Sequence, residues 1–208
     1  MVLSQSDRNA VKEILKEMDR EVKLLFFEGE NCEYCSAIKE LLSELTDLGK
    51  IKLEVLDINS DLAKELNLEG APAIVIDNNR RIRFMGIPSG HEFRAFLDAI
   101  IMVSTGKYKL SDEAKGMLEK VNKPVEIKVF ITPTCPYCPI AVFTAHKFAV
   151  ANENVTSKMI EAIEYPKLAE KYGVMAVPKI VINDKVQFEG AVPDHIFAQH
   201  VLQALKGE

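Results

Sequence analysis

All four cysteines of this 208-residue chain fall into two pairs with C-x-x-C spacing, Cys32 with Cys35 and Cys135 with Cys138. Such pairs exchange disulfides, bind zinc or form structural bridges. With so few cysteines, and no secretory signal at the start of the sequence, we expect a reducing compartment, where a permanent bridge is disfavoured. Zinc ribbons separate their pairs by roughly 15–20 residues, whereas Cys35 and Cys135 are 100 positions apart. The spacing therefore favours redox chemistry, and we expect no metal.

Each pair follows a predicted buried strand, at residues 22–27 and 125–131, and precedes a predicted helix. The start of a helix offers free N–H groups and the positive end of the dipole, which stabilise the attacking thiolate. We therefore expect the first cysteine of each pair to be the exposed nucleophile. The second, one helical turn later, should be buried and should resolve the mixed disulfide.

The two pairs differ in their charged neighbours. The first is close in sequence to Glu28, Glu30 and Glu33, whereas residues 129–142 contain no acidic residue. Negative charge disfavours a thiolate, so Cys135 should have the lower thiol pKa. Pro136 should strengthen this difference by holding the first helical turn in shape.

The predicted elements occur twice along the chain. Length and composition fit two globular domains, and we place them at residues 1–106 and 107–208. In the first unit, helices are predicted at residues 6–18, after Cys35 through the apolar positions 38–45, at 60–67 and at 92–102, and strands at 22–27, 51–56, 73–76 and 81–85. In the second, helices are predicted at 111–121, from the cysteine pair to about 151, at 167–172 and at 195–205, and strands at 125–131, 155–160, 179–182 and 186–188.

A proline opens the third predicted strand of each unit, Pro72 after Ala71 and Pro178 after Val177. Together with the cysteine pairs, these prolines resemble those of the two-unit protein disulfide oxidoreductases, or glutaredoxin-like proteins, of thermophilic archaea and bacteria. The resemblance covers essentially the whole chain, and the Pro-Tyr dipeptide of the second pair is typical of glutaredoxins. It implies an α/β chain of two tandem thioredoxin folds, each with its own mixed sheet, helices on both faces and an additional N-terminal helix.

The resemblance also implies how the sites work. Both X-Pro bonds should be cis, which leaves the backbone of Ala71 and Val177 free to pair with an extended substrate. Cys32, Cys35, Cys135 and Cys138 would exchange disulfides with protein substrates, with no cofactor, with a thioredoxin reductase as recycling partner and with a role in cell redox homeostasis. Thioredoxins and disulfide isomerases often bury an acid six residues before the first cysteine, but here those positions are Phe26 and Val129.

Two other functions share this pattern. One is an electron-relay module similar to the N-terminal part of flavoprotein hydroperoxide reductases, and the other is a redox-inactive binding scaffold. Two intact cysteine pairs favour the general oxidoreductase. The net charge of −5 argues against nucleic acid, and no apolar run is long enough to cross a membrane, so we expect a cytoplasmic protein. We expect the four histidines at the surface or at helix caps.

Overall fold

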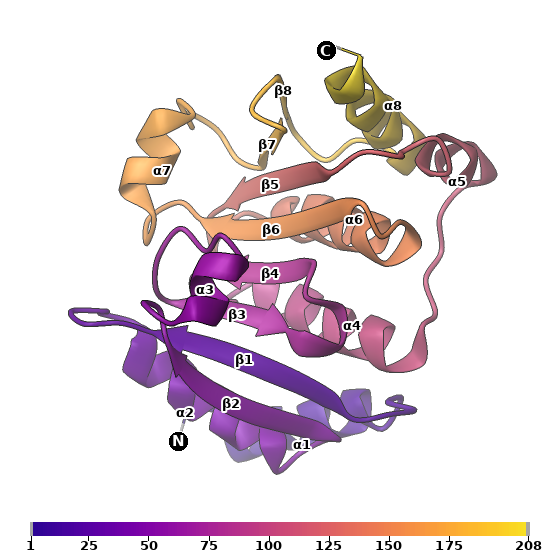
Figure 1. The fold of residues 1–208 in the computed structure, drawn as a ribbon. Coiled ribbons are helices and arrows are strands. Elements are labelled where there is room, and N and C mark those ends of the chain that lie inside the picture. The colour runs from indigo at the N-terminus through magenta and orange to yellow at the C-terminus, as the bar shows by residue number, and fades with distance from the viewer. Residues whose placement is uncertain (1, 207–208) are drawn as a thin grey trace.

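The computed structural model describes residues 2–206, which form one eight-stranded mixed sheet covered by helices (Figure 1). The strands are β1 (Val22–Glu28), β2 (Ile51–Asp57), β3 (Ala73–Ile76), β4 (Ile82–Met85), β5 (Val125–Ile131), β6 (Val155–Glu161), β7 (Lys179–Ile182) and β8 (Val186–Glu189). The helices are α1 (Gln5–Leu15), α2 (Cys35–Thr46), α3 (Asp61–Glu65), α4 (Glu92–Thr105), α5 (Asp112–Leu118), α6 (Cys138–Ala151), α7 (Pro166–Lys171) and α8 (Asp194–Leu205), with a 3-10 turn at η1 (Asp77–Asn79).

Local signals in the sequence account for several helix boundaries. The side chains of Ser4, Ser60 and Ser111 accept backbone N–H groups at the starts of α1, α3 and α5, as N-cap residues do. Gly106 ends α4 in the left-handed conformation at φ 69°, which glycine adopts without a steric penalty. The last helix of the first half therefore ends at Gly106, where the sequence predicts the boundary between the two units.

The sheet corrects one expectation. Each half contributes four strands in the same arrangement, but β4 pairs in parallel with β6, from Ile82 opposite Ser157 to Met85 opposite Ile160. The two halves therefore share one continuous sheet, in the order β2-β1-β3-β4-β6-β5-β7-β8. Both partner strands are almost wholly buried, so the edge pairing removes two apolar strand edges from solvent.

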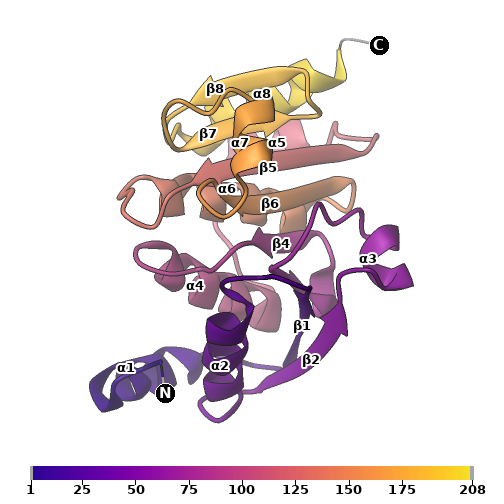
Figure 2. The same cartoon turned by 90° about the vertical axis from the view of Figure 1, so that its left-hand side faces the viewer.

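Helices cover the two faces unequally. A continuous core joins α1, α2, α4, α5, α6 and α8 to one face, whereas a smaller cluster joins α3 and α7 to the other (Figures 1 and 2). The helices α1 and α5 are the two expected additions before the first strand of each half.

A buried ion pair ties the halves together on the smaller face. The ammonium of Lys158, whose side chain is only 1% exposed, lies 2.6 Å from Glu69 Oε1 and 2.7 Å from Glu126 Oε2. It also donates to the carbonyl of Asn67. Lys158 lies on β6, while Asn67 and Glu69 belong to the first half, so these contacts cross the junction of the two repeats.

Two further observations concern expectations from the sequence. His146 does not lie at the surface: it is wholly buried, with Nδ1 2.8 Å from the hydroxyl of Ser157, because α6 packs on the sheet along its length. Within residues 2–206, no helix is long and apolar enough to cross a membrane.

Candidate functional site

Both cysteine pairs lie in the turn between a buried strand and a helix. Cys32 is in the loop after β1 and Cys35 is the first residue of α2, while Cys135 follows β5 and Cys138 begins α6. Each pair forms a disulfide, with Cα atoms 5.4 Å apart in the first and 5.5 Å in the second. Partner cysteines therefore lie within direct reach of one another, as the spacing predicts.

The sheet directs both pairs to the same edge. β1 is antiparallel to β3 and β3 to β4, while β4, β6 and β5 run parallel. β1 and β5 thus point the same way, so both pairs lie at the left-hand side of Figure 1, which faces the viewer in Figure 2. Four strand spacings of about 4.8 Å place the strands roughly 19 Å apart, so the four sulfurs do not form one zinc site.

The exposure of the sulfurs partly differs from expectation. Cys35 and Cys138 are buried, at 6% and 0% exposed, and Cys32 is partly exposed. Cys135, however, is only 7% exposed, so the expectation that it is freely exposed is wrong. The reason is the loop before β7, whose Val177 carbonyl oxygen lies 3.7 Å from Cys135 Sγ. In each pair the first cysteine is still the more accessible one.

The helix start contributes a hydrogen bond to the second site. The backbone N–H of Cys138 donates to Cys135 Sγ at 3.1 Å, and such a bond favours the thiolate once the pair is reduced. Because α6 begins at Cys138, Pro139 lies in its first turn. Pro136 precedes the helix, so its expected place within the first turn is wrong.

The two predicted proline loops face the cysteine pairs. The Ala71–Pro72 and Val177–Pro178 bonds are both cis, as expected. The carbonyl of Pro72 accepts the N–H of Gly86, and that of Pro178 accepts the N–H of Gly190, so the two loops are held alike.

The first site contains residues of the second half, which the sequence did not indicate. A pocket of about 340 Å³ is lined by residues that include Cys32, Tyr34, Ala71, Pro72, Ile163 and Glu164. In addition, the buried hydroxyl of Tyr165 donates to the carbonyl of Pro72 at 2.9 Å. The turn between β6 and α7 therefore completes the wall opposite Cys32.

The loop after β4, in the first half of the chain, contacts the second site. The N–H of His91 donates to the carbonyl of Pro133 at 3.2 Å, two residues before Cys135. Gly90 must be small here, because a Cβ atom would lie 2.4 Å from that carbonyl oxygen, and its φ is +57°. Glu92, two residues after Gly90, is wholly buried, and burial raises its pKa to about 8.

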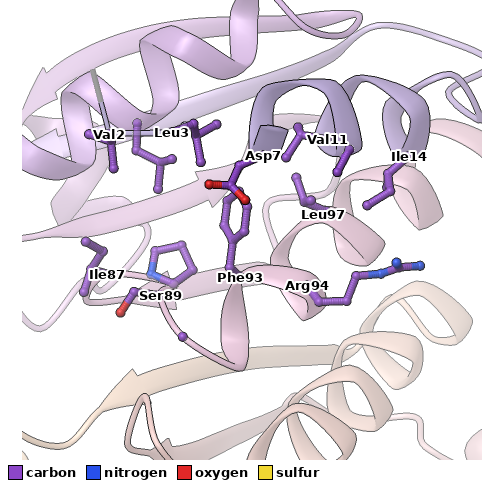
Figure 3. Close-up of a pocket in the computed structure, with 14 residues that line it drawn as sticks. Val2, Leu3, Asp7, Val11, Ile14, Ile87, Ser89, Phe93, Arg94 and Leu97 are labelled. Carbon is purple, nitrogen blue, oxygen red and sulfur yellow. The ribbon is translucent and has the colours of Figure 1, made fainter. Parts of the chain in front are cut away.

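A separate pocket of about 450 Å³ lies between α1, α4 and the loop after β4 (Figure 3). Its lining is mainly apolar, including Val11, Phe93 and Leu97, with the charged side chains of Asp7 and Arg94. None of the four cysteines lines it, so we assign the thiol chemistry to the sheet edge.

The exposures predict an order of alkylation. After reduction, Cys32 and Cys135 should react with iodoacetamide at neutral pH before Cys35 and Cys138, because the earlier sulfur of each pair is the more accessible one. Cys135 also accepts a helix N–H that favours its thiolate. Peptide mass spectrometry of partly labelled protein measures the order, with guanidinium-unfolded protein as the control. Preferential labelling of Cys35 or Cys138 would contradict the assignment.

The comparisons with known proteins agree with this geometry. The family model of the thioredoxin domain matches residues 125–203. The structure superposes on the crystal structure of a protein disulfide oxidoreductase from Aeropyrum pernix with a TM-score of 0.90. The two are 33% identical in sequence, and the match covers 99% of this chain and 94% of that one.

A second group of relatives consists of hydroperoxide reductases and a dehydrogenase. The N-terminal domain of the alkylhydroperoxide reductase AhpF from Enterococcus faecalis is 26% identical, with a TM-score of 0.86 over 96% of this chain and 99% of that one. A Bacillus subtilis NADH dehydrogenase and the corresponding alkyl hydroperoxide reductase of Staphylococcus aureus are each 26% identical over 88% of this chain. The chain spans about a third of these two proteins, 35% and 34% of their lengths.

Proposed function

The chain belongs to the family of the thioredoxin-fold protein disulfide oxidoreductases, and from this premise we propose that it reduces, oxidises or isomerises the disulfides of protein substrates at two sites. The observation that carries the proposal is the repeated arrangement of a C-x-x-C pair at a helix start, opposite a cis-proline loop. We propose two functional domains that share the sheet, residues 1–106 and 107–208, each with one site.

The reducing direction uses both cysteines of a pair in turn. The thiolate of Cys32 or Cys135 attacks a substrate disulfide, forms a mixed disulfide and releases one substrate thiol. Cys35 or Cys138 then attacks the sulfur of the first cysteine, Cys32 or Cys135, in the mixed disulfide. This step closes the bridge present in the structure and releases the second substrate thiol. Two electrons pass from the dithiol to the substrate, and no cofactor is needed.

Exposed apolar side chains near both sites support protein substrates. Ile163 in the pocket of Cys32 is 66% exposed, and Tyr137 beside Cys138 is 65% exposed. Such side chains suit apolar segments of a partner chain. Ala71 and Val177 would pair with the substrate backbone. A thioredoxin reductase would restore the dithiols, and we place the reaction in the cytoplasm, without nucleic acid or membrane as partners.

A second candidate function is electron relay to one fixed flavoprotein partner. The similarity to the alkyl hydroperoxide reductases favours it. A relay needs one working pair in contact with its partner, however, whereas here each of the two pairs has its own proline loop.

Turnover on a general substrate tests the proposal. The wild-type chain should accelerate insulin reduction by dithiothreitol, and a variant with all four cysteines replaced by serine should not. A dedicated relay would leave the insulin reaction at its uncatalysed rate while the chain still accepts electrons from a flavoprotein reductase. A binding scaffold would do neither.

A further inference from the structure

Glu164 lies in the turn between β6 and α7, in the second half of the chain, yet it lines the pocket of Cys32 in the first half. The same pocket includes Ala71 and Pro72, where a substrate would lie. Glu164 therefore forms part of the wall around the space in which the substrate disulfide would meet Cys32.

The carboxyl is held firmly on one side. Its Oε1 atom accepts the N–H of Ile87 at 2.7 Å, and the Glu164 N–H donates to Glu161 Oε2 at 2.7 Å. Gly86, at φ +107°, allows this approach, because a Cβ atom there would lie 2.6 Å from Glu161 Cβ and 3.1 Å from Glu164 Oε1. The turn is thus fixed against the loop after β4.

The other oxygen is unused. Glu164 Oε2 is buried and has no hydrogen-bond partner within residues 2–206. A buried polar atom without a partner destabilises a fold, so its position at the wall of a reactive pocket points to a ligand or a proton that it serves. No acid lies six residues before either first cysteine, where Phe26 and Val129 stand.

We propose that Glu164 exchanges protons for the Cys32 site, so that the second half of the chain supplies the acid–base group of the first. The inference rests on the proposed function of Cys32. The unpartnered oxygen of the carboxylate takes the proton of the Cys32 thiol. The thiolate attacks the substrate disulfide, one S–S bond forms as another breaks, and the departing substrate thiolate takes the proton back from Glu164.

The charges around Glu164 suit this role. Burial, followed by the charges of Glu161 and Glu33, raises its pKa, while the N–H of Ile87 lowers it, and the result is about 7. A group with this pKa both accepts and releases protons near neutral pH. The other titratable groups that face it are Tyr34 on the cysteine loop, the neighbouring Tyr165, and Glu69, Lys167 and Lys171 in an adjacent pocket.

The test is the Glu164→Gln variant with the second pair removed as Cys135→Ser/Cys138→Ser, so that only Cys32 and Cys35 react. Insulin reduction at pH 7 should fall at least ~10-fold, and the inflection near pH 7 should disappear from the pH profile of kcat/KM. Glu170→Gln, an exposed glutamate of α7, is the matched control. In the Cys32→Ser/Cys35→Ser background, the same Glu164→Gln change should cause a much smaller loss, and equal losses in both backgrounds would overturn the proposal.

A second readout does not depend on turnover. The thiolate absorbance of Cys32 at 240 nm should titrate in two coupled steps in the parent, and Glu164→Gln should lower the Cys32 pKa by about half a unit, because a negative neighbour is removed. An unchanged titration together with an unchanged pH profile would overturn the role of Glu164. A parent that titrates as expected but reduces no insulin would instead contradict the proposed function of the site.

Discussion

Cys135→Ser is expected to lose about three quarters of the disulfide-reducing turnover, whereas Cys32→Ser keeps about three quarters of it. Acidic side chains near Cys32, Glu33 and Glu164 among them, each cost its thiolate about 0.5–1 kcal/mol. The Cys135 sulfur instead accepts the N–H of Cys138. The fraction of Cys135 present as thiolate should therefore be about tenfold that of Cys32. The difference in reaction rate should be only about three- to fourfold, because a more acidic thiol is a weaker nucleophile.

The measurement is insulin reduction by each serine variant and by the double variant Cys32→Ser/Cys135→Ser, which should show no catalysis. The greater exposure of Cys32 works against the electrostatic advantage of Cys135. A larger loss in Cys32→Ser than in Cys135→Ser would mean that access, not charge, decides the rates. Thiolate absorbance separates the two causes, since a Cys32 pKa equal to or below that of Cys135 refutes the electrostatic argument.

The second large effect concerns stability and Glu92. Its side chain is wholly buried, and neither carboxyl oxygen has a hydrogen-bond partner within residues 2–206. Burial raises its pKa from 4.5 to about 8, so the folded state favours the protonated form. The stabilising contribution of this proton is complete below about pH 4.5 and is lost as the pH rises through about 8. A shift of this size corresponds to about 3–5 kcal/mol.

Urea unfolding at pH 5, 7 and 9 measures this loss. The free energy of unfolding of the wild type should fall over this range, relative to that of Glu92→Gln, which is neutral at every pH. Glu113→Gln, an exposed glutamate at the start of α5, should follow the wild type. Parallel curves for wild type and Glu92→Gln would show that the buried carboxyl does not titrate with folding.

The sequence specified the local parts of this fold well. Strands β3, β5 and β7 have the predicted bounds, because short apolar runs between turn residues leave little choice of boundary. The cysteine pairs and cis prolines lie where the repeat places them. These features depend on neighbours close in the chain or on a pattern that occurs twice.

Contacts between the halves could not be predicted in the same way. Nothing in the sequence of β4 shows that it pairs with β6, because an apolar edge strand does not specify its partner. Glu164 and Tyr165 follow β6 in an ordinary turn, and only the shared sheet brings them to Cys32 and Pro72. The near burial of Cys135 likewise depends on a loop distant in sequence.

Trapping of the covalent intermediate tests the central claim, that two cysteine pairs exchange disulfides with protein substrates, most directly. Cys35→Ser and Cys138→Ser remove the resolving thiol of one pair while leaving its nucleophile. Each variant, reduced and mixed with a disulfide-containing protein, should accumulate a mixed disulfide that peptide mass spectrometry locates on Cys32 and on Cys135, respectively. If neither variant forms an adduct that dithiothreitol releases, or if the adducts lie on other residues, the two-site account is wrong.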